Sequence, residues 1–304
     1  VDEQQAHKVL EKALELGIDN LDTSNAYGSG LSENRIGSFL KKFGSKKQDL
    51  FKIATKAGIT RSKDGTRYYD NSLGHLELEL DMSLKRLGLE QVDLFYVHRK
   101  DKDTEIEEVT ESLAKLIKKG KIKQFGFSEI APTSLERASK VHPVAAVQSE
   151  YSLATRYPEL GLLQKCLSLG TTMVAFSPVG RSILTDNPHN RARAEKMPFL
   201  KNNPRFMSPN LERNVEVTKS FRLFARERGY SAASLSIAWL LSRGPHILPI
   251  PGTRSPKRLE ELVQGIYLKL TVDDLREIDK LLPVGWAHGD RYSTEQWVGP
   301  ERYS

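Results

Sequence analysis

Four side chains suited to acid–base chemistry lie in the first third of the chain. Asp22, Lys56 and His98 each end an apolar run, and Tyr27 follows Asp22 in a predicted turn. A nearby ammonium group favours the phenolate form of a tyrosine and so lowers the pKa of the phenol, while a carboxylate keeps that ammonium charged. Such a phenol can donate a proton near neutral pH. Each residue alone has an ordinary explanation as a cap, a core group or a packing residue, so the prediction depends on a fold that brings the four together.

The elements that must position these residues alternate regularly between helix and strand. Apolar residues at helical spacing predict a first helix that Gly17 ends. The strands are continuous apolar runs, the pattern of parallel strands buried on both faces. Two later helices are predicted to begin with capping boxes, Thr104 with Glu107 and Thr133 with Glu136. The seven predicted strands are residues 18–22, 50–56, 92–98, 122–128, 144–148, 172–176 and 246–250.

This alternation, without a break in composition or a flexible linker, predicts one parallel α/β domain over residues 1–304. The best-fitting class is a (β/α)8 TIM barrel, in which active-site residues gather at the carboxyl ends of the strands. An open doubly wound sheet is the alternative, but its glycine-rich turn would need a third glycine where Glu33 follows Gly28 and Gly30. A closed barrel needs an eighth strand, which we expect before the first helix, in an N-terminal segment missing from a chain that begins at Val1.

Composition disfavours several classes of protein. The chain has 304 residues, 38% hydrophobic and 28% charged, which is enough for a large core. Its single cysteine, Cys166, cannot form an internal disulfide, so we expect a reducing, cytoplasmic environment. No apolar stretch approaches the roughly 20 residues of a membrane span, and the histidines show no spacing typical of a metal site. A formal charge of +7 suits a phosphorylated cofactor or a solvated basic surface, but no basic run of the kind that binds nucleic acid is present.

Ordered motifs along nearly the whole chain resemble those of the aldo-keto reductases. The resemblance implies a TIM barrel that binds NADPH and reduces aldehydes or ketones, so that the partner is a small-molecule carbonyl substrate. The motifs are Leu21–Gly28, Ile53–Lys56, Tyr96–Arg99, Gly126–Glu129, Gln148 with Tyr151, Phe176–Arg181 and Ile250–Arg254.

The resemblance implies a role for each of the four acid–base residues. Tyr27 would be the general acid and Lys56 the ammonium that favours its phenolate. Asp22 would be the partner of Lys56, and His98 would orient the substrate carbonyl. The alternative is a slow-turnover, cofactor-binding subunit with a regulatory or redox-sensing role, because the same four residues can persist in relatives that resemble channel β-subunits. Neither the physiological substrate nor the oligomeric state follows from the sequence.

The same resemblance implies a set of cofactor contacts. Many members have asparagine in place of Glu129, and a carboxylate cannot donate a hydrogen bond as an amide does. Arg254 and Arg258 favour NADPH over NADH, because guanidinium groups form forked, charge-assisted hydrogen bonds to a 2′-phosphate. They could instead cap the following helix on a solvated face. The implied contacts are Ser128, Glu129 and Gln148 at the nicotinamide carboxamide, Tyr151 stacked on the nicotinamide, Ser177, Val179 and Arg181 at the pyrophosphate, and Thr253, Arg254, Ser255, Arg258 and Glu261 at the adenosine end.

Two segments interrupt the regular alternation. Residues 184–210 contain four prolines and little periodicity, which is typical of a lid or binding loop. The tail over 283–304 is rich in aromatic residues, namely Trp286, Tyr292, Trp297 and Tyr303. We expect both segments to lie over the active-site face and, with the loop that begins at Arg99, to set substrate choice, although the tail could be only a packed surface segment.

Overall fold

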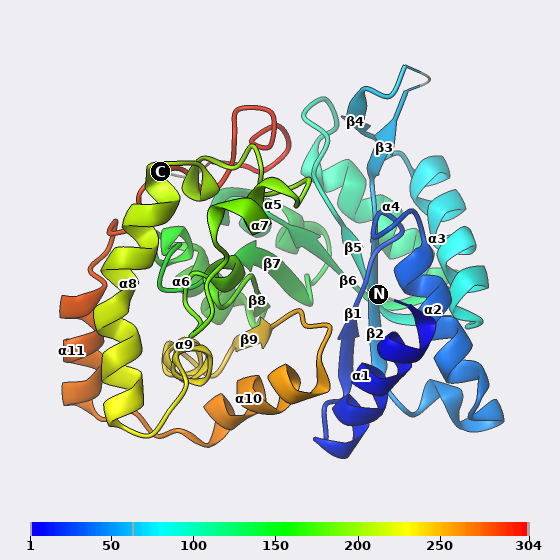
Figure 1. The fold of residues 1–304 in the computed structure, drawn as a ribbon. Helices are drawn as coiled ribbons and strands as arrows, with labels where there is room; N and C mark the ends of the chain where they lie inside the picture. Colours follow the sequence, from blue (N-terminus) through cyan, green and yellow to red (C-terminus); the bar gives the residue numbers. More distant parts are fainter. Residues whose placement is uncertain (1, 63, 303–304) are drawn as a thin grey trace.

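Seven parallel strands form a nearly closed barrel at the centre of the molecule (Figure 1). The computed structural model describes residues 2–62 and 64–302. The strands pair in the order β1-β2-β5-β6-β7-β8-β9, and no pairing of β9 with β1 is present within these residues. Their bounds are β1 Asn20–Asp22, β2 Lys52–Ala57, β5 Val92–Val97, β6 Ile122–Ser128, β7 Ala146–Glu150, β8 Thr172–Phe176 and β9 Ile247–Ile250. All seven predicted strands are confirmed, and no end is shifted by more than two residues.

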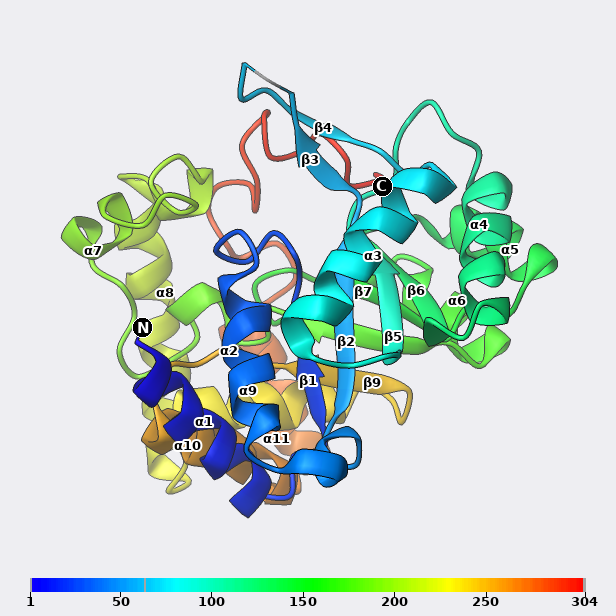
Figure 2. The same ribbon diagram turned by 90° about the vertical axis from the view of Figure 1, so that its right-hand side faces the viewer.

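Helices surround the strands and pack against one another in chain order (Figures 1 and 2). The first helix, α1, also packs against α10, so the helical layer is continuous across the gap between β9 and β1. No helix within the described ranges is both long and apolar enough to cross a membrane. The helices are α1 Glu3–Glu15, α2 Leu31–Lys41, α3 Leu73–Leu87, α4 Ile106–Lys118, α5 Pro132–Val141, α6 Leu162–Leu169, α7 Arg191–Glu195, α8 Asn210–Glu227, α9 Ala232–Leu241, α10 Pro256–Tyr267 and α11 Val272–Leu281.

The two predicted capping boxes are wrong. The helix α4 begins at Ile106 without a side-chain cap, and the hydroxyl of Thr104 donates to the Asp101 carboxylate instead, at 3.2 Å. The helix α5 begins one residue before Thr133, at Pro132, whose fixed φ suits the first helical position. The Thr104 hydroxyl has a different partner, and Pro132 rather than Thr133 begins α5, so neither threonine caps its helix.

The apolar core has an outer and an inner part. The outer part fills the space between strands and helices, with Phe95 and Phe125 among its fully buried residues. The inner part unites residues of five strands, and we place it inside the barrel: Tyr96, Ala146 and Val174 pack with Ala54, Leu94 and Ile250. Because side chains alternate along a strand, the residue two places after Ala54 also points inward. That residue is Lys56.

A hairpin that the sequence analysis did not predict follows β2. Its strands, β3 Ile59–Arg61 and β4 Arg67–Tyr69, are antiparallel and extend beyond the carboxyl end of β2 (Figure 2). The hydroxyl of Tyr69 donates to the carbonyl of Val298, so the hairpin contacts the C-terminal tail. The hairpin and the tail therefore meet at this end of the barrel.

The two irregular segments are packed rather than extended. Residues 184–210 include α7 and a 3-10 turn, Pro204–Phe206, and they bury Leu200 and Phe206. In the tail, Trp286 and Tyr292 are buried. Trp297 is half-buried, and the fourth aromatic residue predicted there, Tyr303, lies outside the described residues.

We expect Gly37→Ala to destabilise the protein, because Gly37 on α2 lies against the backbone of α3. A Cβ atom there would lie 2.1 Å from the carbonyl oxygen of Arg86. Relief of that overlap needs a backbone shift, so the free energy of unfolding should fall by about 1–3 kcal/mol in urea titrations. The matched control is Gly74→Ala in α3, where a Cβ would meet nothing within 4 Å. That variant should be unchanged or up to about 1 kcal/mol more stable, and equal stability of the two variants would contradict the packing argument.

Candidate active site

The four predicted acid–base residues come together at the carboxyl ends of three adjacent strands. Asp22 ends β1, Lys56 lies near the end of β2, and His98 follows β5 directly. Tyr27 lies in the turn between β1 and α2, and its ring packs edge-on against His98 with 5.8 Å between centroids. The fold therefore supplies the grouping that the sequence analysis required.

Lys56 is the centre of the group. Its side chain is fully buried, and its ammonium donates to the Asp22 carboxylate, to the carbonyl of Thr23 at 2.8 Å and to the Tyr27 hydroxyl at 3.3 Å. Burial opposes the charged form, yet the Asp22 carboxylate and Tyr27 outweigh it and raise the pKa of Lys56 above its ordinary value. The lysine is therefore a cation whose three donors all have partners.

His98 is held as a neutral imidazole. Burial, followed by the charges of Arg99 and Lys56, keeps its pKa well below the ordinary value of 6.5. Its Nδ1 atom lies 3.2 Å from the Ser24 hydroxyl. A neutral imidazole carries a single N–H, and when Ser24 donates to Nδ1 that N–H is at Nε2. This arrangement leaves one hydrogen-bond donor for a ligand.

Polar contacts to β2 and α3 hold the segment that carries Tyr27 in place. Glu33, at the start of α2, is fully buried, and its carboxylate accepts hydrogen bonds from Thr55 at 2.5 Å and from Arg86 at 2.6 Å. Asn25 donates to Glu79 on α3 at 2.6 Å. Tyr27 itself is 42% exposed. The turn thus holds an accessible phenol in a fixed position. The structural role of Glu33 was not predicted, because in the sequence Glu33 was considered only as a departure from a glycine motif.

The residues predicted at the nicotinamide have different surroundings. Gln148 joins the central group, because its amide donates to Asp22 at 2.8 Å, and Ser128 accepts from Arg99 at 2.9 Å. Tyr151 is buried in this structure, since its residue is 0% exposed and its ring lies 5.6 Å from that of Trp239, and its stacking on the nicotinamide stays a prediction. The phenol of Tyr151 donates to Glu159 at 2.8 Å, as a core tyrosine does when it needs a polar partner.

Glu129 and Arg181 are bound to other protein groups. The carboxylate of Glu129 forms an ion pair with Arg291 of the tail, with 2.5 Å between Nη2 and Oε2. The guanidinium of Arg181 donates to Glu150 at 2.6 Å. In this structure both side chains that were predicted to contact the cofactor are bound to other protein side chains. Ser177 and Arg181 both have positive φ, so the segment after β8 turns sharply, and Val179 lies within that turn.

The residues predicted at the adenosine end lie around the start of α10. Thr253 accepts from the backbone of Ser255, and Ser255 is the N-cap of α10. The side chains of Arg254 and Arg258 are exposed, and no carboxylate lies within 4.0 Å of either among residues 2–62 and 64–302. Because the helix already has Ser255 as its cap, and cations are unfavourable at a helix N-terminus, the arginines are not its capping groups. Glu261 follows on the first turns of the same helix.

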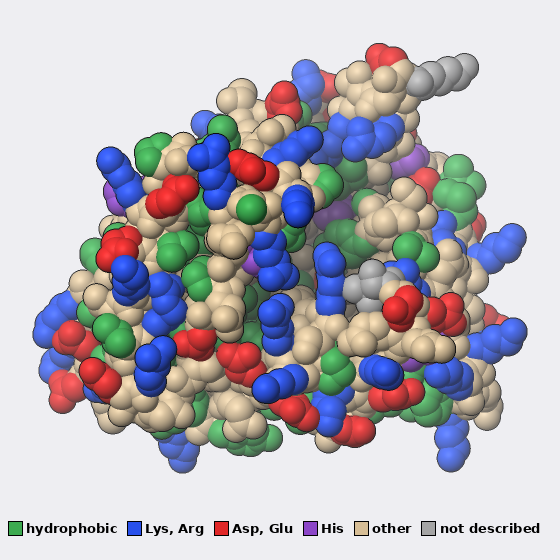
Figure 3. Space-filling model, in the orientation of Figure 1, with side chains coloured by type: hydrophobic (Ala, Val, Ile, Leu, Met, Phe, Trp, Pro, Cys, Tyr) green, Lys and Arg blue, Asp and Glu red, His purple; other side chains and the backbone are tan. Residues whose placement is uncertain are grey.

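One face of the molecular surface has a basic hollow. Figure 3 shows a hollow on the face that carries α1 and α10, with Lys and Arg side chains gathered around it. A basic rim and a helix N-terminus both attract phosphate groups. Within the part of the chain that the structure describes, no three His, Cys, Asp or Glu side chains are grouped so that they could hold a metal ion.

Comparisons with known proteins agree on one family. The model of the aldo/keto reductase family matches residues 1–283. The chain is 35% identical to "Probable aldo-keto reductase 1" of Glycine max, over 95% of this chain and 83% of that protein. It is 36% identical to "Aldo-keto reductase yakc [NADP(+)]" of Schizosaccharomyces pombe, over 95% and 86%. Among solved structures, the glycerol dehydrogenase AKR11B4 from Gluconobacter oxydans is similar, with a TM-score of 0.81 and 27% identity over 92% of this chain and 85% of that one.

We expect the neutral state of His98 to make the protein less stable as the pH falls. The unfolded chain takes up a proton at this histidine near pH 6.5, but the folded chain does not, because its pKa is lowered. Protons therefore favour the unfolded state below that pH, by up to about 1.4 kcal/mol per pH unit. Urea titrations from about pH 7.5 to about pH 5.5 should show a steeper loss of stability for the wild type than for His98→Gln. Parallel curves for the two proteins would mean that His98 is protonated in the folded state.

Proposed function

The chain belongs to the aldo/keto reductase family, and from that premise we propose that it is an NADPH-dependent enzyme that reduces aldehydes and ketones to alcohols, with Tyr27 as the general acid. The observation that carries the proposal is the contact of the buried Lys56 ammonium with both the Asp22 carboxylate and the Tyr27 hydroxyl. An oxidoreductase of this family needs a proton donor at the place where the carbonyl oxygen binds. The accessible phenol beside Lys56 meets that need.

The residues of the chain fit NADPH as the cofactor. Arg254 and Arg258 have no carboxylate within ion-pair distance among the described residues, and they flank the N-terminus of α10, so they suit the 2′-phosphate. We propose the other contacts from Thr253, Ser255 and Glu261. When it is bound, NADPH supplies the hydride. Ser128 and Gln148 would face its nicotinamide, and the turn of Ser177, Val179 and Arg181 its pyrophosphate.

The proton is moved by the four central residues. The Tyr27 hydroxyl gives its proton to the carbonyl oxygen as the carbonyl carbon is reduced, and the resulting phenolate lies next to the Lys56 ammonium. Asp22 keeps that ammonium in place and charged. His98 donates its N–H to the same carbonyl oxygen and so fixes its orientation. Because Tyr27 is partly exposed, water can return the proton after the product leaves.

Tyr27→Phe should abolish carbonyl reduction and leave cofactor binding intact, because only the proton donor is removed. We expect kcat for a simple aromatic aldehyde to fall by about 10²–10⁴-fold, with the Kd for NADPH within about twofold, a change of less than 0.5 kcal/mol. The matched control is Tyr68→Phe, a similarly exposed tyrosine on β4. Wild-type turnover that persists in Tyr27→Phe would remove Tyr27 from this role, and a wild type that binds NADPH without turnover would indicate a cofactor-binding subunit.

Arg258→Ala should weaken NADPH far more than NADH. The variant loses a charge-assisted bond to the 2′-phosphate, worth about 1.5–3 kcal/mol, so the Kd for NADPH should rise by about 10- to 100-fold. Fluorescence titration with each cofactor measures both constants. Arg276→Ala on α11 is the control, because Arg276 is exposed and, within the described part of the chain, pairs only with the neighbouring Asp273. An equal loss for both cofactors would mean that the 2′-phosphate is recognised elsewhere.

A further inference from the structure

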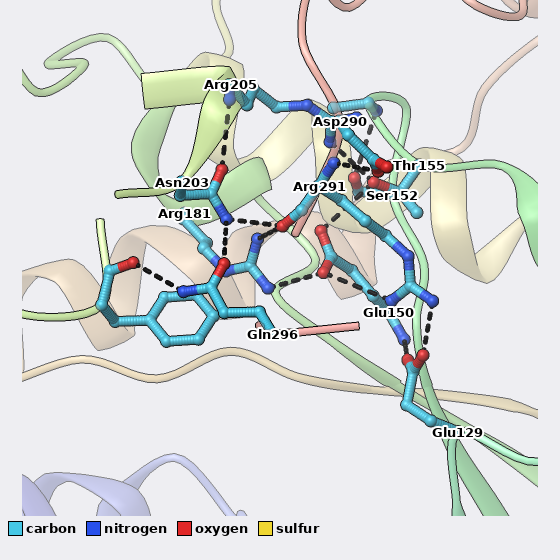
Figure 4. Close-up of polar contacts among 12 residues, drawn as sticks. Glu129, Glu150, Ser152, Thr155, Arg181, Asn203, Arg205, Asp290, Arg291 and Gln296 are labelled. Carbon is cyan, nitrogen blue, oxygen red and sulfur yellow. Dashed lines mark hydrogen bonds and ion pairs between the residues drawn. The ribbon is translucent and has the colours of Figure 1, made fainter. Parts of the chain in front are cut away.

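Two buried carboxylates lie side by side at the ends of β6 and β7 (Figure 4). Glu129 and Glu150 are each only 2% exposed. The Glu129 carboxylate accepts the backbone N–H of Glu150 at 2.8 Å through Oε1, and it binds Arg291 through Oε2. Burial opposes the charged form of Glu129, but the Arg291 guanidinium outweighs it and lowers the pKa of this carboxyl. Glu129 is therefore an ion whose charge is balanced by the tail.

Arg291 is the tail residue that balances both carboxylates. It is 4% exposed; its Nη2 donates to Glu129, and its Nη1 lies 3.7 Å from Glu150. Its guanidinium lies 4.6 Å from the ring centroids of both Tyr292 and Trp297. The same cation thus meets the strand ends on one side and the aromatic residues of the tail on the other.

Further bonds fix the tail to the residue at position 129 and its neighbours. The backbone N–H of Glu301 donates to the carbonyl of Glu129 at 2.8 Å. The Glu301 carboxylate in turn accepts the N–H of Ala131 at 2.6 Å. Both the main chain and the side chain of Glu129 therefore hold the tail.

The segment over 184–210 joins the same network. Asn203 donates to the carbonyl of Arg291 at 2.5 Å. Arg181, bound to Glu150, stacks on Phe199 of that segment at 4.8 Å and on Tyr292 at 5.5 Å. Figure 4 shows Asn203 of the segment and Arg291 of the tail close to the carboxylates at the ends of β6 and β7.

The path of the tail crosses the mouth of the barrel. Through Arg291 the tail contacts Arg181 after β8 and the carboxylates at the ends of β7 and β6, and through Val298 it contacts Tyr69 in the hairpin after β2. Tyr292 of the tail is buried, and burial, followed by the charge of Glu129, raises the pKa of its phenol above the ordinary value. Arg99 is the residue next to His98 and donates to its carbonyl at 2.6 Å.

We propose that Glu129 and Arg291 form a positioning pair that anchors the tail across the mouth, so that Trp297 borders the carbonyl substrate, and that Glu129 is not a ligand of the nicotinamide carboxamide. The inference rests on the proposed function for the identity of the substrate. A carboxylate cannot donate to the carboxamide oxygen, and both oxygens of Glu129 already have protein donors. The anchoring itself depends only on the contacts of the tail.

The test compares Glu129→Gln, Arg291→Gln and the double variant. Glutamine keeps the shape of glutamate but removes the charge that holds Arg291. In Glu129→Gln we expect KM for bulky aldehydes to rise by about tenfold, the loss of one charge-assisted hydrogen bond, with kcat for a small aldehyde and the Kd for NADPH little changed. Arg291→Gln should raise KM for bulky aldehydes further, because it leaves the buried Glu129 carboxylate without this cation. The double variant should have a lower KM than Arg291→Gln, because neither partner is then left charged and unpaired.

Limited proteolysis tests whether the tail is anchored, and it does not depend on the reduction of any substrate. Chymotrypsin cleaves after aromatic residues, so release of the tail should speed cleavage at Tyr292 and Trp297 in both single variants. Glu107→Gln is the matched control, because it removes a carboxylate from an exposed ion pair with Arg137 on the α4–α5 surface. Thermal melting verifies folding, and if Arg291→Gln does not fold, Arg291→Lys, which keeps the cation but not the fork, should show a weaker form of the same pattern.

Two results would overturn the proposal. A higher Kd for NADPH in Glu129→Gln, with the ranking of aldehydes and the proteolysis rate unchanged, would make Glu129 a cofactor contact. Wild-type values throughout would make the pair simple packing. If instead the wild-type protein reduced no aldehyde, the proposed reaction would fail, while the proteolysis and NADPH titrations would still decide whether the pair anchors the tail.

Discussion

The buried ammonium of Lys56 is the constraint around which the rest of the site is arranged. A charge without a partner inside a protein is strongly unfavourable, and removal of one member of a buried ion pair is typically destabilising by about 3–5 kcal/mol. Lys56 meets this requirement with a carboxylate, a backbone carbonyl and a phenol. Each partner comes from the segment that leads from β1 into α2. The position of that segment, and of Tyr27 within it, is thus bound to the position of one lysine.

The barrel makes this arrangement possible because parallel strands present their carboxyl ends at a single edge. Ala54 lies in the apolar interior, and Lys56, one alternation further along β2, lies where that interior gives way to polar groups. The strands β1 and β5 on either side of β2 then supply Asp22 and His98. Because β1 pairs with β2 and β2 pairs with β5, the side chains of Asp22, Lys56 and His98 lie next to one another.

Much of this could be predicted from sequence, since the strands are apolar runs and strand-end residues meet in a parallel barrel. The hairpin of β3 and β4 was not predicted, because two three-residue strands without an apolar run leave no periodic signal. The burial of Tyr151 could not be predicted, because its motif gives a chain position and not the surroundings of its ring. The pairing of Glu129 with Arg291 joins residues far apart in the chain, and no local pattern at either residue indicates the other.

The location of Arg291 near the end of the described chain has a consequence for synthesis on the ribosome. All seven strands and every helix of the described residues precede it in the sequence, so they leave the exit tunnel first. Until Arg291 follows, the Glu129 carboxylate after β6 lacks its cation and must stay hydrated, whereas Glu150 at the end of β7 can already pair with Arg181. The tail can therefore cover the ends of β6 and β7 only after all the strands of the barrel have been made.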